Sequence, residues 1–407
     1  MCGIIGYIGS RKAQPILLNC LSKLEYRGYD SCGIAVCSDG IQTYKDAVRV
    51  GELQEVMPKF EGTSGIGHTR WATHGEPSPV NAHPHFDCSG RIGVVHNGVI
   101  NNFQELRQQL STEEHNFVSE TDTEVIPHLI EKYYRGNLKE AVEAALSDIE
   151  GSYAILVLMA GEPRLVVARK DSPLVIGVGD GENFIASDVP AILDYTNRVI
   201  DLEDGDIGVV DRDGIKITRD RVEISTEESK VAWSREDVQK AGYEHYMLKE
   251  IHEQPRVIRE TLGEYLSIEP VADSGLVLDE DVERLSIIAC GTSYHAGLVG
   301  QYVIESLLRI PVRIELASEF NHSGQTLDAR EALIITQSGE TADALMAMKR
   351  LREAGIRTKV LTNVPRSTAS RFADKTAYTR ARPEISVAAT KTFIAQLIAI
   401  YELALSI

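Results

Sequence analysis

The sequence predicts two domains of different fold class: an α+β domain of stacked antiparallel sheets between helices over residues 1–220, and an α/β domain with a parallel sheet over residues 243–407. Three observations support this division. Short apolar strands crowd the first half, strands and helices alternate in the second, and a polar stretch at 221–242 separates the two. A chain of 407 residues is also long enough for about two to three domains.

The first half is rich in strands that are separated by turns rather than by helices. Such strands pair antiparallel, and the few helices between them can cover the outer faces of stacked sheets. The expected strands include 33–36, 91–95, 153–159, 165–168 and 174–177, and the expected helices are 13–24, 102–110, 124–134 and 138–146.

The stretch 221–242 is rich in charged residues, which predicts a linker or mobile connector. The segment YEHYMLKEIHEQP follows at 243–255, and we expect a helix from there to about residue 266.

In the second half, strands are followed by small-residue loops and then by helices. Because parallel strands need crossover helices, this alternation predicts a parallel sheet with helices on both faces. Ligands bind beyond the carboxyl ends of strands in such sheets. The expected strands are 284–289, 312–316, 332–336 and 358–362, with helices at 294–308 and 341–353, the latter ended by Gly355.

Composition narrows the class of protein. The formal net charge of −18 argues against a nucleic-acid partner, and the absence of an apolar run of about 18 residues argues against a membrane partner, so we expect a cytoplasmic protein. Six cysteines show no CxxC pair and no metal-ligand spacing, which predicts reduced thiols and no metal or other cofactor. Cys20, Cys32 and Cys37 are interpreted as small core residues.

Cys2 is the first candidate for chemistry. Removal of Met1 would leave Cys2 with a free α-amine beside its thiol, so nucleophile and base would share one residue. The amine suits this role because its reference pKa of about 8 leaves an unprotonated fraction near neutral pH. The alternative is that a small second residue stands there by chance.

Three polar segments of the first half complete a candidate amide-cleaving site. The Asn97 side chain and the Gly98 N–H, at the expected end of a strand, could stabilise the oxyanion that forms when a thiolate attacks an amide. Arg70, within GHTRWATHGEP, could bind an α-carboxylate, and Asp122, within SETDTE, could bind an α-ammonium group. Each assignment has a simpler alternative. Asn97 and Gly98 could form a type I′ hairpin turn, Arg70 could belong to a surface ion pair, and Asp122 could be a helix N-cap.

Two loops of the second half, CGTS at 290–293 and TQSGET at 336–341, each follow an apolar strand and open a helix. Free N–H groups and the helix dipole make such a helix start favourable for an anion. Two such loops in one domain point to a phosphorylated ligand. Capping of the helices by Ser and Thr is the alternative for each loop.

The motifs CGIIGYIG, LEYRGYDS, HTRWATHGEPS, NAHPH, HNG and SETDTE resemble the glutamine amidotransferase domain of the glutamine–fructose-6-phosphate aminotransferase family. The resemblance covers residues 1 to about 220. It implies that Cys2 is the glutaminase nucleophile, with Asn97 and Gly98 as the oxyanion hole. It implies that Arg27 lies near the domain interface and that Trp71 gates ammonia passage. It assigns glutamine binding to Arg70, Trp71, Thr73, His74, His83 and Asp122.

The second half is similar to the sugar isomerase (SIS) fold of the same family, with EISVAATKT at 384–392 as a third ligand-contacting segment. The resemblance assigns the sugar phosphate to Thr292, Ser293, Thr336, Gln337, Ser338, Thr341 and Val387. Two residues depart from the family pattern. Thr336 stands where serine is usual and keeps the hydroxyl, whereas Ala389 stands where serine is usual and loses one sugar contact.

The family carries two tandem sugar isomerase domains, and residue 407 falls about where the first ends. The resemblance therefore implies either a truncated form or a chain that works with a separate subunit. The residues that open the sugar ring, form the imine and isomerise the ketose would lie in the second domain, so none is assigned here.

We expect a glutamine-dependent amidotransferase that passes ammonia to fructose 6-phosphate to give glucosamine 6-phosphate and glutamate, with the second step incomplete in this chain. A homodimer is expected from the resemblance. Two alternatives stay open: a glutaminase with a regulatory sugar-phosphate-binding domain, and a non-enzymatic sugar-phosphate sensor that retains Met1.

Overall fold

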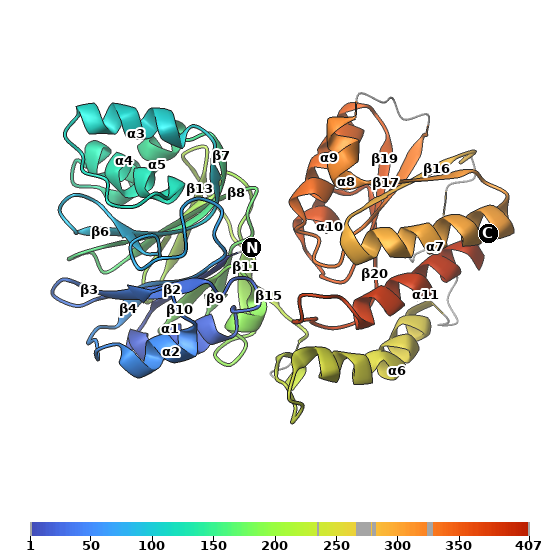
Figure 1. Cartoon of the computed structure of the whole chain (residues 1–407), viewed down its shortest axis with the longest axis horizontal. Coiled ribbons are helices and arrows are strands. Elements are labelled where there is room, and N and C mark those ends of the chain that lie inside the picture. Colours follow the sequence, from blue (N-terminus) through green and yellow to red (C-terminus); the bar gives the residue numbers. More distant parts are fainter. Residues whose placement is uncertain (1, 234–235, 266–277, 279–281, 324–328, 406–407) are drawn as a thin grey trace. The chain divides into compact units, whose positions relative to one another are not determined.

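The computed structural model describes residues 2–233, 236–265, 278, 282–323 and 329–405, and the chain divides into two compact units, Met1–Trp233 and Ser234–Ile407 (Figure 1). The antiparallel sheets of the first unit and the parallel sheet of the second confirm the predicted fold classes.

The first unit contains two antiparallel sheets. The order of the first is β15 (Ser229–Lys230), β11 (Arg198–Asp201), β9 (Val175–Val178), β10 (Asn183–Ala186), β1 (Gly3–Ile8), β4 (Ser64–Arg70), β2 (Ser31–Cys37), β3 (Ile41–Asp46). The order of the second is β14 (Val222–Ile224), β13 (Ile215–Arg219), β12 (Ile207–Val210), β8 (Leu165–Lys170), β7 (Gly151–Met159), β6 (Ile92–Ile100), β5 (His85–Phe86).

Helices cover the outer face of each sheet (Figure 1). The helices on the first sheet are α1 (Ala13–Ser22) and α2 (Val50–Val56), and η2 (Val189–Ala191) lies beside them. Those on the second are α3 (Phe103–Thr112), α4 (Val125–Tyr133), which the short η1 (Asp122–Glu124) precedes, and α5 (Leu138–Ser147). The unit is therefore a four-layer sandwich of helices, sheet, sheet and helices.

Strand β1 is buried on both faces, which explains why its sequence is apolar throughout. Ile4 and Ile8 belong to the core between the two sheets, whereas Ile5 and Tyr7 belong to the core under the helices. Successive side chains of a strand point to opposite faces, so a strand covered on both faces must be apolar at every position. Cys20, Cys32 and Cys37 are buried in these cores, as predicted.

The second unit has a parallel sheet with the order β17 (Val312–Leu316), β16 (Leu285–Ala289), β18 (Glu331–Ile335), β19 (Arg357–Thr362), β20 (Lys375–Tyr378). One face packs on α7 (Gly291–Leu308) and α11 (Lys391–Leu405), and α6 (Tyr246–Tyr265) packs on α11 (Figure 1). The other face packs on α8 (Ala317–His322), α9 (Ala342–Glu353) and α10 (Thr368–Phe372).

Three local expectations were wrong. Strand β6 does not end at residue 95 but continues to Ile100, because β7 pairs with it along its whole length. Helix α6 begins before Pro255 and runs through it, since Val257 is fully buried against Ala395 of α11 and this packing outweighs the proline penalty. The predicted connector carries β14, β15 and η3 (Glu236–Val238), and its first two strands extend both sheets.

Among the described residues, we find no helix that is both long and apolar enough to cross a membrane.

Candidate active site

Cys2 lies at the start of β1, beside the end of β4. Its sulfur accepts a hydrogen bond from the Trp71 N–H at 3.2 Å. The next residue is Gly3, which pairs with Thr69 of β4; a Cβ there would lie 2.5 Å from the Thr69 hydroxyl, so this part of β1 requires glycine. Burial raises the pKa of the Cys2 thiol, and the Trp71 N–H only partly opposes this. A base is therefore needed to generate the thiolate at neutral pH.

Two side chains hold the carbonyl oxygen of Cys2. Arg27 donates through Nε at 3.0 Å and Asn97 donates through Nδ2 at 2.9 Å. Arg27 is itself buried and pairs with Asp188 at 3.2 Å. Arg27 thus positions the backbone of Cys2, a contact that the sequence did not indicate, and its role at a domain interface stays a prediction.

Asn97 and Gly98 lie within β6 rather than in a turn, so the hairpin reading is wrong. His68 Nε2 lies 3.0 Å from the His96 carbonyl oxygen and 3.1 Å from Asn97 Oδ1. Since both partners are acceptors, Nε2 carries the proton, and the Asn97 amide nitrogen is left facing Cys2. Gly98 has a φ of +140°, and a Cβ there would lie 2.0 Å from the Ser152 carbonyl oxygen, which excludes any side chain.

Arg70 is buried at the end of β4, so the surface ion-pair reading is wrong. Its guanidinium binds the backbone carbonyls of the loop that follows: Nη2 donates to His74 and, at 3.1 Å, to Gly75, and Nη1 donates to Glu76 at 3.3 Å. Burial lowers the pKa of Arg70. This loop is therefore folded around a desolvated cation.

Asp122 is buried as well, and its carboxylate accepts the Ile100 N–H at 2.8 Å rather than an N–H of its own helix. The N-cap reading is therefore wrong. Asp122 Oδ1 lies 3.7 Å from Nδ1 of the half-buried His74, which in turn lies 3.4 Å from the hydroxyl of the exposed Thr73. Arg70, Thr73, His74 and Asp122 thus gather around one loop.

Trp71 and His83 are placed differently. Trp71 is 49% exposed, and its ring packs edge-on against that of Tyr29. His83 is buried, stacks on His68 at 4.0 Å and contacts the Thr123 hydroxyl at 3.0 Å. His83 therefore supports the site from inside the sandwich in this structure, and its contact with glutamine stays a prediction.

In the second unit, the predicted sugar-phosphate residues line one cavity of about 360 Å³. It lies at the carboxyl ends of the neighbouring strands β16 and β18. The helices that follow these strands, α7 and α9, pack on opposite faces of the sheet. This is the switch point at which α/β sheets bind ligands. The lining includes Thr292, Ser293, Thr336, Gln337, Ser338, Thr341, Val387 and Ala389.

Hydroxyl groups order the TQSGET loop. The Thr336 hydroxyl accepts the Gly339 N–H at 3.2 Å and lies 3.3 Å from the Thr341 hydroxyl. Ser338 accepts the Glu340 N–H at 3.1 Å. Thr341 is the N-cap residue of α9 but makes no side-chain capping bond, so capping alone does not explain its hydroxyl. The loop is preorganised by its own side chains.

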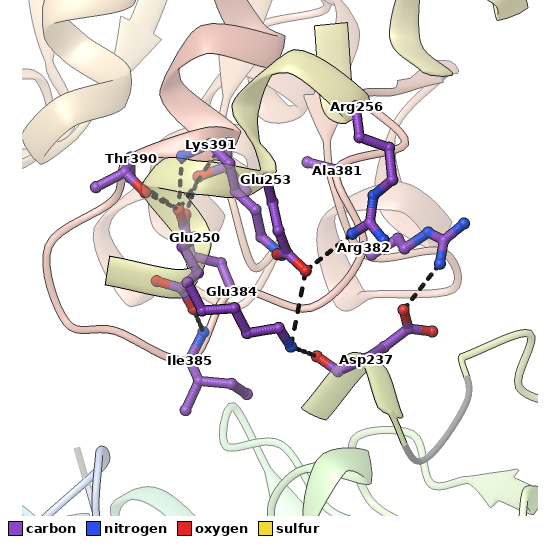
Figure 2. Close-up of polar contacts among 12 residues, drawn as sticks. Asp237, Glu250, Glu253, Arg256, Ala381, Arg382, Glu384, Ile385, Thr390 and Lys391 are labelled. Atoms are coloured by element: carbon purple, nitrogen blue, oxygen red, sulfur yellow. Dashed lines mark hydrogen bonds and ion pairs between the residues drawn. The ribbon is translucent and has the colours of Figure 1, made fainter. Parts of the chain in front are cut away.

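The third segment of the cavity is anchored to α6 and α11 (Figure 2). Glu250 of α6 accepts the Ile385 N–H at 2.6 Å, and Glu384 accepts the N–H groups of Thr390 and Lys391 at 2.8 and 3.0 Å. Lys391, which is 1% exposed, pairs with Glu253 at 2.7 Å. The sequence did not single out Glu250 or Glu384 individually; the hydrogen bonds of the buried Glu250 and the half-buried Glu384, which depend on tertiary packing, are what reveal them.

Comparison with known proteins agrees with this arrangement. Residues 68–194 match the family model of a glutamine amidotransferase domain, and residues 280–406 match that of a SIS domain. Two proteins called glutamine–fructose-6-phosphate aminotransferase (isomerizing) are 50% identical to this chain. The one from Caldanaerobacter subterraneus subsp. tengcongensis aligns over 420 residues, which cover 100% of this chain and 68% of that protein. The one from Methanothermobacter thermautotrophicus aligns over 412 residues, which cover 99% of this chain and 69% of that protein.

Among solved structures, glutamine phosphoribosylpyrophosphate amidotransferase from B. subtilis, complexed with ADP and GMP, is similar in fold. It is 20% identical, with a TM-score of 0.50 over 93% of this chain and 90% of that one. The sequence identity to the two aminotransferases, over the whole of this chain and two thirds of theirs, shows that the chain belongs to the glutamine–fructose-6-phosphate aminotransferase (isomerizing) family.

Proposed function

We propose that this protein is a glutamine-dependent amidotransferase that hydrolyses glutamine at Cys2 and supplies the ammonia to fructose 6-phosphate held in the second unit. One observation supports the proposal most directly. The Cys2 sulfur accepts the N–H of Trp71, which begins the loop after β4. The same loop binds the buried Arg70 and brings His74 close to the buried Asp122. A nucleophile beside a buried cation and a buried anion suits a free α-amino acid.

The reaction would proceed in two steps once Met1 is removed. The Cys2 α-amine takes the thiol proton, the sulfur attacks the γ-carboxamide carbon, and the C–N bond breaks as the nitrogen leaves with a proton as ammonia. Water then hydrolyses the γ-glutamyl thioester to glutamate and frees the thiol. Gly98 N–H and the second N–H of the Asn97 amide would stabilise the oxyanion of both tetrahedral intermediates.

Arg70 would bind the α-carboxylate of glutamine and Asp122 its α-ammonium group. Thr73 and His74 lie on the loop between them and would complete the contacts. Because Arg70 already binds three carbonyls of this loop, it also fixes the loop's shape. We propose that Trp71, which is exposed beside Cys2, gates the release of ammonia.

The second unit would bind the phosphate at the starts of α7 and α9, with the hydroxyls of Ser293, Thr336, Ser338 and Thr341 around it. The product would be glucosamine 6-phosphate. This chain spans 68% of the length of its relative from Caldanaerobacter. We therefore propose the complete synthase reaction only for a protein that also contains the third of the relative that this chain does not cover.

Glutamate release from glutamine tests the first half-reaction. We expect Cys2→Ala to abolish it, whereas Cys37→Ala, which alters a buried thiol in the core, keeps it. Mass spectrometry of the wild-type N-terminus should show that Met1 is removed. Equal glutaminase rates for wild type and Cys2→Ala would refute the proposal.

A second assay separates the synthase from its alternatives. Amino sugar formed from glutamine and fructose 6-phosphate would show a synthase, and glutamate release without amino sugar would show a glutaminase. Retention of Met1 with sugar-phosphate binding only would show a sensor.

We also propose a cytoplasmic homodimer. Light scattering during size-exclusion chromatography would test the oligomeric state, and cell fractionation would test the location.

A further inference from the structure

Four potential metal ligands that the proposed function does not use meet on the first unit. Cys88 lies in the turn between β5 and β6, His115 follows α3, and His128 and Glu131 lie one turn apart on α4. Their ligand atoms all lie within 4.8 Å of one another. His128 is 1% exposed, whereas Cys88 is exposed and leaves a path from solvent.

The spacing of these atoms fits a tetrahedral zinc site. Cys88 Sγ lies 3.6 Å from His115 Nδ1 and 3.5 Å from His128 Nδ1. Glu131 Oε2 lies 3.0 Å from His115 Nδ1 and 3.6 Å from His128 Nδ1. Zinc bonds of about 2.3 Å to sulfur and about 2.0 Å to nitrogen and oxygen, at tetrahedral angles, require separations of about 3.6 and 3.3 Å, respectively.

The surroundings of the four groups also match those of a metal site. Nε2 of His128 is buried, has no hydrogen-bond partner among the residues that the structure describes, and faces Glu124 Oε1 at 3.9 Å. A carboxylate that faces Nε2 favours the tautomer that carries its proton there and ligates through Nδ1, although at 3.9 Å this contact is not yet a hydrogen bond. The Asn116 N–H approaches Cys88 Sγ at 3.5 Å, an arrangement that stabilises a thiolate.

We propose that Cys88, His115, His128 and Glu131 bind a structural Zn²⁺ ion. One sulfur, two imidazole nitrogens and one carboxylate oxygen are ligands that zinc accepts, and four protein ligands leave no open position for a reacting water. The ion would fasten the β5–β6 turn and the segment after α3 to α4.

The ion would also stabilise the segment that carries Asp122. Glu124, beside His128, accepts the N–H groups of Val118 and Ser119 at 2.8 and 2.7 Å. The metal would fix His128, His128 faces Glu124, and Glu124 holds the backbone of Val118 and Ser119. This series of contacts would therefore stabilise residues 118–124, which include Asp122. The proposal does not depend on the glutaminase reaction, because metal content can be measured without activity.

The test compares the full-length wild type with His115→Gln and Cys88→Ser after dialysis in metal-free buffer with and without added zinc. We expect the wild type to retain about one zinc ion per chain by plasma mass spectrometry and both variants to retain about a tenth or less. His245→Gln is the matched control, since that histidine is 72% exposed in the second unit. It should bind zinc as the wild type does.

Cobalt substitution provides a readout that does not require a stable variant. Wild type with Co²⁺ should show the intense visible bands of tetrahedral cobalt and a sulfur-to-cobalt charge-transfer band, and added zinc should abolish both. Wild type that neither retains zinc nor gives these cobalt bands would overturn the proposal, and the cluster would then be held by hydrogen bonds alone. Cys88→Ser and His115→Gln variants that each retain as much zinc as the wild type would overturn it too.

Discussion

The Asn97 side-chain amide donates to the Cys2 carbonyl oxygen at 2.9 Å, so the residue expected to stabilise the oxyanion also holds the backbone of the proposed nucleophile. A primary amide has two N–H groups, and the second is available to a substrate oxygen. His68 fixes the amide from its other side at 3.1 Å. Asn97 is therefore rigid before substrate arrives, as preorganised stabilisation requires.

We predict that Asn97→Ala lowers the kcat of glutamine hydrolysis by about 10²–10³-fold with a small change in KM, because it removes a donor used most strongly in the transition state. Steady-state kinetics of glutamate release measures this. Asn197→Ala, at an exposed position of the same unit, is the control. A kcat within about threefold of wild type would contradict the assignment.

We predict that Arg70→Lys raises the KM for glutamine by about tenfold or more, because a charged hydrogen bond is worth about 1.5–3 kcal/mol and lysine lacks the planar fork. The thermal unfolding temperature should also fall, since the loop carbonyls of His74 and Gly75 lose donors. The exposed Arg135→Lys should change neither. An unchanged KM would show that Arg70 does not bind the substrate and that its role is purely structural.

Four buried histidines should make the first unit sensitive to acid. Burial lowers the pKa of His68 to about 3, and it also lowers the pKa values of His83, His85 and His96. In the unfolded chain these groups have a pKa of about 6.5, so below that pH the unfolded state binds more protons. We predict that the free energy of unfolding is highest above about pH 6.5 and falls as the pH decreases, by up to about 1.4 kcal/mol per pH unit for each histidine.

Urea unfolding followed by tryptophan fluorescence measures this slope, because Trp71 and Trp233 both belong to the first unit. His85→Gln removes one of the titrating groups, so its slope between about pH 7 and 5 should be shallower than that of the wild type. His245→Gln should leave the slope unchanged. A slope that His85→Gln does not alter would show that this histidine does not titrate on unfolding.

Ala389 lines the sugar-phosphate cavity at a position where the family resemblance predicts serine. We predict that Ala389→Ser tightens the binding of fructose 6-phosphate about two- to tenfold, since a restored hydrogen bond is worth about 0.5–1.5 kcal/mol. Isothermal titration calorimetry of the full chain gives the Kd. Ala354→Ser, at the exposed C-cap of α9, is the control. Weaker binding by Ala389→Ser would show that the alanine fits this cavity as it stands.

Local sequence patterns predicted most of the secondary structure and several of the residues that the structure brings together near Cys2 and in the cavity of the second unit. The apolar run of β1 and the stop at Gly355, whose φ of +72° favours glycine, depend only on neighbouring residues. The strand–loop–helix alternation was enough to place Thr336 and Ser338 beside Ser293 in one cavity, because parallel strands end at the same edge of a sheet.

Contacts between distant segments could not be predicted in this way. Asn97 and Gly98 look like a turn in sequence and become strand residues only because β7 pairs with them. The cysteine spacing suggested no metal site, yet Cys88 meets His128, 40 positions further along the chain, through the packing of a turn on α4. Sequence alone thus determined the periodicities, the backbone requirements of glycine and the inventory of reactive groups. Tertiary structure decided which groups meet, because long-range packing and burial set their distances and pKa values.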